Sequence, residues 1–119
     1  MGSISKISDY VGGASTIVPL QPLVKEVLNG EDMRIFTITV PIEFSTAKLR
    51  HYHSSKRLIV VDGAMMVHLR DGIHRLVKED QILIPATEPH SYQNIGRIPL
   101  KLVEIRTGSY LDDDEIVGI

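Results

Sequence analysis

The sequence predicts an all-β domain made of short antiparallel strands, as in a sandwich or a barrel. Apolar and polar residues alternate along 33–40 and 100–106, which is typical of half-buried strands. Turn residues recur between such stretches, and no segment keeps the period of a helix. A chain of 119 residues has the size of one domain.

A strand is expected at 33–40, after a turn at 29–32. The preceding segment, 18–28, contains two prolines, so a long helix is not expected there. Along the strand, one face is formed by Phe36, Ile38 and Val40 and alternates with a face formed by Ile35, Thr37 and Thr39.

Glycine and charged turns separate the later strands. An apolar, β-branched run at 58–61 ends at Asp62-Gly63, and a second turn contains Asp71-Gly72. Glycine tolerates the positive φ that such hairpin turns require. The remaining strands are expected at 64–69, 73–77, 81–84, 91–94 and 100–106.

Two histidines precede the run at 58–61, two positions apart. If this segment is extended, His51 and His53 point to the same face, with α-carbons about 6.6 Å apart. His90 lies far along the chain, in the segment 85–94 that begins with a proline-rich turn. Three histidines placed in this way predict a polar pocket inside a small β-barrel.

These two histidine segments resemble the signature stretches of the cupin superfamily, whose fold is an antiparallel jelly-roll barrel. The matching stretches here are 51–63 and 85–94. The tail 98–117 is most similar to type II mannose-6-phosphate isomerases and to the cupin domain fused to mannose-1-phosphate guanylyltransferases. The resemblance implies a divalent-metal site and the interconversion of an aldose phosphate with a ketose phosphate. It does not extend to a nucleotidyltransferase domain.

Four positions depart from the pattern of these isomerases. Leu49 stands where the pattern has Gln, Lys56 where it has Glu, and Ser54 and Ser91 where it has Arg. Two usual metal ligands and two arginines suited to phosphate are therefore replaced.

With these replacements, the metal site is expected to consist of His51, His53 and His90. The chain has no cysteine, so nitrogen and oxygen are the available ligands, and Zn, Fe, Ni or Mn are the candidate ions. An ammonium at Lys56 would repel such an ion. A site without metal is therefore the alternative, with a histidine as the base and Lys56 or Arg57 as the positive charge. In that form the segment also resembles cupin ketoisomerases that act on nucleotide-linked deoxysugars.

Four further side chains are candidates for the pocket. Lys56 and Glu104 are assigned catalytic roles, and Tyr92 and Arg106 are assigned to substrate binding. Glu104 and Arg106 share one face of the last predicted strand, and a simple salt bridge between them is the alternative. The acidic run 112–115 is expected to be a solvated end.

Two classes of function remain open. The first is an isomerase of a sugar or sugar phosphate, and the second is a non-catalytic cupin that binds a sugar or a metal. The net charge of −2 and the scattered basic residues argue against nucleic acid as a partner. No apolar run is long enough for a membrane span, and residues 1–13 do not resemble a signal peptide, so a cytoplasmic protein is expected. Residues 1–16 are expected to form an arm on the single domain 17–119 and to cross to a second copy in a homodimer.

Overall fold

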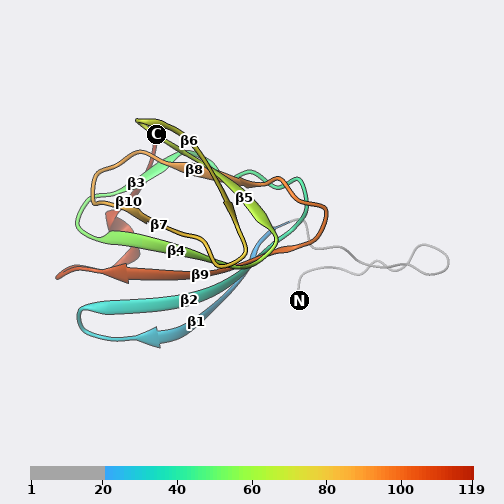
Figure 1. Ribbon diagram of the computed structural model, residues 1–119. Helices are drawn as coiled ribbons and strands as arrows, with labels where there is room; N and C mark the ends of the chain where they lie inside the picture. Colours follow the sequence, from blue (N-terminus) through green and yellow to red (C-terminus); the bar gives the residue numbers. More distant parts are fainter. Residues whose placement is uncertain (1–20) are drawn as a thin grey trace.

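The computed structural model describes residues 21–119, and its regular structure is almost entirely β-strand (Figure 1). The strands are β1 (Leu23–Asn29), β2 (Met33–Val40), β3 (Leu49–His51), β4 (Ser55–Asp62), β5 (Ala64–Leu69), β6 (Gly72–Val77), β7 (Gln81–Ile84), β8 (Ser91–Asn94), β9 (Leu100–Thr107) and β10 (Ile116–Gly118). One 3₁₀ turn, η1, spans Asp113–Glu115. The predicted all-β class is confirmed. The predicted arm, 1–16, lies outside the described residues.

The strands form two walls. One wall is a five-stranded sheet in the order β1-β2-β9-β4-β7, and the other contains the three-stranded sheet β6-β5-β8 and the pair β10-β3. All strand pairs are antiparallel. Figure 1 shows the second wall folded over the first, which leaves the inward faces of both to enclose a common interior.

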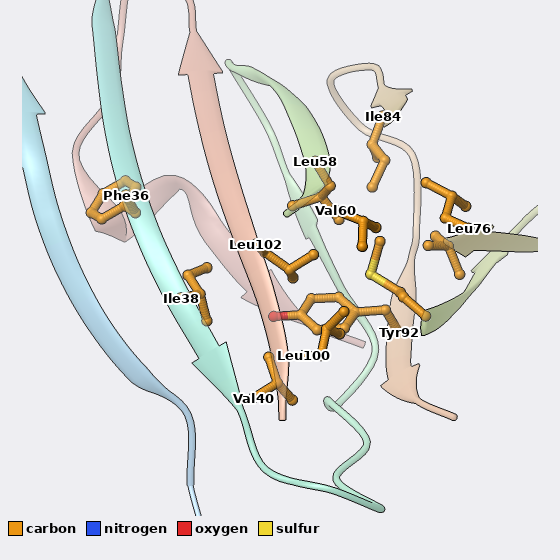
Figure 2. Packing of buried hydrophobic residues seen from close by; sticks show 12 residues of the cluster. Phe36, Ile38, Val40, Leu58, Val60, Leu76, Ile84, Tyr92, Leu100 and Leu102 are labelled. Atoms are coloured by element: carbon orange, nitrogen blue, oxygen red, sulfur yellow. The ribbon is translucent and has the colours of Figure 1, made fainter. Parts of the chain in front are cut away.

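The hydrophobic core packs inside the barrel, with side chains from both walls (Figure 2). The alternating face predicted on β2 is buried, with Phe36 at 6%, Ile38 at 7% and Val40 at 0% exposure. Leu100 and Leu102 lie opposite Val40 and Ile38 on β9. Strand alternation therefore directs these residues inward, and burying their apolar surface contributes most of the stabilisation of the barrel.

Further along the same strands, the inward residues change from apolar to charged. On β9, Leu100 and Leu102 are followed on the same face by Glu104 and Arg106, and on β4 the residue two before Leu58 is Lys56. Because side chains two apart share a face, the backbone that builds the core also carries these charges into the interior. One half of the barrel is thus an apolar core, and the other half is polar.

The turn at Gly63 needs glycine. Its φ is +96°, and a Cβ there would lie 3.2 Å from the α-carbon of Leu100. The predicted Asp62-Gly63 turn is confirmed, and it brings β4 and β5 onto opposite walls of the barrel.

The C-terminal end differs from expectation. Residues of η1 and β10 fold back onto the barrel, with Ile116 paired to His51 and Gly118 to Leu49. Glu115 is 3% exposed, so the prediction of a solvated acidic end is wrong for this residue. Within residues 21–119, no helix has the length and apolar character that crossing a membrane would require.

Candidate functional site

A pocket of about 190 Å³ opens in the polar half of the barrel. Six of the seven predicted site residues line it: His51, Lys56, His90, Tyr92, Glu104 and Arg106. Phe36 and Ile38 from β2 form part of the apolar wall. The pocket therefore joins residues from both walls of the barrel.

The seventh predicted residue, His53, does not join the others. Strand β3 ends at His51, the chain bends at Tyr52 and His53, and the imidazole of His53 is exposed and lies edge-on against Tyr110 with ring centroids 5.2 Å apart. The prediction that His51 and His53 share one extended face is wrong. The bend is held by Glu115, whose carboxylate accepts hydrogen bonds from the backbone N–H groups of His53 and Ser54.

His51 is oriented by a hydrogen-bonded chain. Its Nδ1 lies 3.3 Å from the hydroxyl oxygen of Ser54, and that hydroxyl donates to Oε2 of Glu115. A carboxylate can only accept, so the hydroxyl proton lies toward Glu115 and Ser54 accepts from Nδ1–H of His51. This assignment, made from the network, leaves the lone pair of His51 on Nε2.

His90 has the same tautomer for a different reason. Its Nδ1–H donates to the carbonyl of Glu88 at 2.9 Å, so Nε2 carries the lone pair. That Nε2 is buried and has no hydrogen-bond partner among the described residues. The rings of His51 and His90 are stacked with centroids 5.7 Å apart. Leaving a buried acceptor without a partner is costly, so this nitrogen is placed to accept a hydrogen bond or a proton from a group that enters the pocket.

Both histidines are neutral near pH 7. Burial, followed by the charge on Lys56, lowers the pKa of His51 to about 4 and that of His90 to about 4. Burial, followed by the nearby Glu104 carboxylate, raises the pKa of the Tyr92 hydroxyl. The pocket therefore offers two basic nitrogens and one neutral phenol.

The charged groups of the pocket form a chain. Nζ of Lys56 lies 3.8 Å from Oε1 of Glu104, and Nε of Arg106 donates to Oε2 of the same carboxylate at 2.7 Å. Burial raises the pKa of Glu104, but Lys56 and Arg106 outweigh it and the net shift is downward. Burial lowers the pKa of Lys56, and Glu104 opposes that shift. Glu104 thus forms a salt bridge with Arg106 and also lines the pocket. The predicted pocket position and the alternative of a salt bridge are therefore both found.

These donors do not make up the ligand set expected for a catalytic divalent metal. Within residues 21–119, no three side chains of His, Cys, Asp or Glu are arranged to hold an ion. His53 is turned away, Leu49 offers no donor, and Glu104 is engaged by two cations. A further cation beside the buried Lys56 would be repelled.

Two residues of the site were not identified from sequence. The sequence marks Ser54 only as a replacement and predicts that Glu115 lies in a solvated end, yet the two side chains together orient His51. The β-branched pair Ile116-Val117 was the available signal that the chain end returns to a sheet.

The structure resembles solved cupin structures, which confirms the jelly-roll cupin fold. The cupin domain of Cnp3 from Schizosaccharomyces pombe matches with a TM-score of 0.73 at 16% identity, covering 84% of this chain and 74% of that one. KdgF from Halomonas matches with a TM-score of 0.71 at 19% identity, covering 83% and 89%.

The sequence is similar to curated mannose-1-phosphate guanylyltransferases. ManC from Salmonella typhimurium is 34% identical over 88 residues, which are 74% of this chain and 18% of ManC. The chain thus spans about a fifth of the length of such relatives. The model of the family described as "Mannose-6-phosphate isomerase C-terminal" matches residues 23–119, and the chain belongs to this family.

Proposed function

We propose that this domain isomerises a small sugar or sugar phosphate between its aldose and ketose forms, without a metal ion. One observation carries the proposal: two neutral imidazoles and a buried ammonium face the same pocket, in the half of the barrel where the core ends. These are the two kinds of group that the reaction requires, a base and a positive charge.

The reaction moves a proton between adjacent carbons. Nε2 of His51 or His90 takes the proton from the carbon beside the carbonyl, and the electrons of the broken C–H bond move into a carbon–carbon double bond while the carbonyl oxygen becomes an enediolate oxygen. Lys56 stabilises that negative charge and Tyr92 donates to a hydroxyl. The proton of the adjacent hydroxyl passes to the enediolate oxygen, which becomes the new hydroxyl. The imidazolium returns its proton to the former carbonyl carbon, and the oxygen that lost its proton becomes the new carbonyl.

The charge of the substrate would change the pKa of the proposed base, His51. The charges of Lys56 and Arg106 contribute to the lowered pKa of His51. An anionic substrate beside these two cations would offset their effect and raise the pKa of His51 toward its ordinary value. A phosphorylated sugar therefore improves the proton transfer as well as the binding.

The size of the pocket favours a monosaccharide. At about 190 Å³ it is smaller than the roughly 300–1,000 Å³ of sites for drug-sized ligands. A single sugar ring suits such a volume better than a nucleotide-linked sugar does.

A binding module without turnover is the second candidate. It is supported by Leu49 and Lys56, which stand where the isomerase pattern has Gln and Glu. In this version the same polar pocket binds a sugar and no proton is transferred.

The proposal is tested by incubating the protein with aldohexose and ketohexose phosphates and following isomerisation by NMR. Turnover that disappears in His51→Ala, His90→Ala protein supports the isomerase. Saturable sugar binding without turnover of any compound in the panel supports the binding module instead. His68→Ala is a matched control, because His68 lies on β5 and does not line the pocket.

A further inference from the structure

Three cations form one row across the five-stranded sheet. Arg34 on β2 lies directly opposite Arg106 on β9, and Arg106 lies directly opposite Lys56 on β4. Residues paired in this way point to the same face, and like charges placed directly opposite destabilise a sheet. With strands about 4.8 Å apart, the row is about 10 Å long. Such a row requires anions between its members.

The two anions between these cations differ in burial. Glu104 lies between Lys56 and Arg106, and its side chain is 6% exposed. Asp113, on η1, accepts from Nη1 of Arg106 at 2.9 Å and from Nη1 of Arg34 at 3.1 Å, and its side chain is 71% exposed. The inner anion is thus fixed in the pocket, whereas the outer one reaches the arginines from solvent.

The two arginines are held in place without Asp113. The guanidinium of Arg34 donates to Glu26 and to the carbonyl of Leu111, and that of Arg106 donates to Glu104. Both guanidiniums also lie over the ring of Phe36, at 5.0 Å and 4.4 Å from its centroid. Figure 2 shows Phe36 at the end of the core cluster away from Val40. Phe36 and Arg106 line the pocket, whereas Arg34 and Asp113 line a second cavity of about 440 Å³, so the preorganised arginine pair reaches from one to the other.

We propose that Arg34 and Arg106 form a subsite for the phosphate group of the substrate, and that Asp113 occupies this subsite when no substrate is bound. The inference deepens the proposed function, because it identifies the substrate as a phosphorylated sugar. Lys56 and the two histidines then face the carbonyl end of the sugar, and the arginine pair holds its phosphate.

A phosphate suits this subsite better than the carboxylate that fills it. It carries more negative charge at neutral pH and offers three acceptor oxygens to two guanidinium groups. Displacing Asp113 costs little, because ion pairs of a largely exposed carboxylate are weak. Asp113 therefore screens the like charges of the empty subsite and competes weakly with the ligand.

The test is a titration of the full chain with inorganic phosphate, at constant ionic strength, followed by ¹H–¹⁵N NMR. Asp113→Asn removes the competing charge and is expected to tighten phosphate binding about threefold or more. Asp112→Asn is the matched control: it makes the same change of charge one position earlier, on a residue outside the arginine pair. Arg34→Met, added to Asp113→Asn, is expected to remove the gain.

Equal phosphate affinity of wild type and Asp113→Asn overturns the inference. So does an equal gain in Asp112→Asn, which would make the effect one of net charge. The backbone spectrum of each variant shows whether the fold is retained. If the Arg34→Met protein unfolds, it is replaced by Arg34→Lys, which keeps the charge but loses the planar guanidinium that binds phosphate in two places.

The same variants separate this inference from the proposed function. Phosphate binding requires no turnover, so it can succeed in a protein without isomerase activity. If isomerisation is found, Asp113→Asn should lower KM for a hexose phosphate and leave KM for the unphosphorylated hexose unchanged. An equal change for both sugars contradicts a phosphate subsite.

Discussion

Nζ of Lys56 lies 3.8 Å from Oε1 of Glu104, and the two side chains are 7% and 6% exposed. A buried pair of this kind contributes little net stability, but the loss of one partner leaves a buried charge. Lys56 is the group whose position in the pocket distinguishes a metal-free site from a metal site.

Replacing Lys56 with Met should slow isomerisation strongly and lower stability. We expect turnover to fall by about 10²–10³, the typical cost of removing one stabilising donor from a transition state. The free energy of unfolding should fall by about 1–3 kcal/mol, less than the roughly 3–5 kcal/mol of a fully orphaned charge. Arg106 explains the smaller loss, because it still pairs with Glu104.

The matched control for this change is Arg57→Met. Arg57 follows Lys56 on β4 but is exposed and hydrogen-bonds to Gln81. Urea denaturation and an isomerase assay measure both variants. Normal activity in Lys56→Met protein would refute the catalytic role of Lys56.

Lys56→Glu should create a divalent-metal site. The new carboxylate would face His51, His90 and Glu104, giving two nitrogens and two carboxylates without the repelling ammonium. We expect Zn²⁺ or Mn²⁺ at saturating concentration to raise the Tm of this variant by about 5 °C or more, because the ion binds the native state.

The same titration on wild-type and Arg57→Glu protein provides the comparison. We expect no change of Tm in either protein, because both pockets keep Lys56. An equal rise in wild-type Tm would show that Lys56 does not prevent metal binding.

Stability should decline as the pH falls from about 6.5 toward 4. The pKa values of His51 and His90 are lowered from 6.5 to about 4 in the folded chain, so the unfolded chain binds more protons over this interval. Each histidine then contributes a slope of about 1.4 kcal/mol per pH unit. Glu104, whose pKa is also lowered, loses its contribution only below its ordinary value of 4.5.

Urea denaturation between pH 8 and pH 4.5 measures this slope. His90→Gln should reduce it by about half, since one of the two groups is gone, and His68→Gln, at a histidine that does not line the pocket, is the control. A stability that is constant over this range would show that these histidines are not buried in the neutral form.

Glu115→Gln should alter the tautomer of His51. The Gln side chain can donate to Ser54 as well as accept, so Nδ1–H of His51 is no longer required. We expect ¹⁵N shifts of the imidazole to show a mixture of tautomers, with kcat falling more than KM rises. Asp114→Asn is the control, because Asp114 contacts Tyr110 outside the pocket. An unchanged His51 spectrum in Glu115→Gln protein would rule out this positioning role.

Local patterns account for most of the fold. Alternation at Phe36, Ile38 and Val40 predicts a strand with one buried face, and glycine at position 63 predicts the turn. The same alternation places Lys56 on the inward face with Leu58, although its charge favours solvent. For Lys56 the period of the strand outweighs the polarity of the side chain, because Glu104 provides a buried partner.

Long-range contacts determine the features of the site that no local sequence pattern predicts. The bend that turns His53 outward depends on Glu115, which lies 62 positions further along the chain. No local pattern distinguishes such a bend from a continued strand. The separation of His53 from the pocket, and the orientation of His51 by Ser54, therefore follow only from the folded arrangement.

The most direct test of the account is the isomerase activity of protein depleted of metal. Untagged protein that has never contacted a nickel column is treated with a chelator, its metal content is measured by elemental mass spectrometry, and its turnover of hexose phosphates is compared before and after treatment. We expect unchanged turnover at a metal content far below one ion per chain. Activity that is lost on chelation and restored by Zn²⁺, Fe²⁺, Ni²⁺ or Mn²⁺ would contradict it.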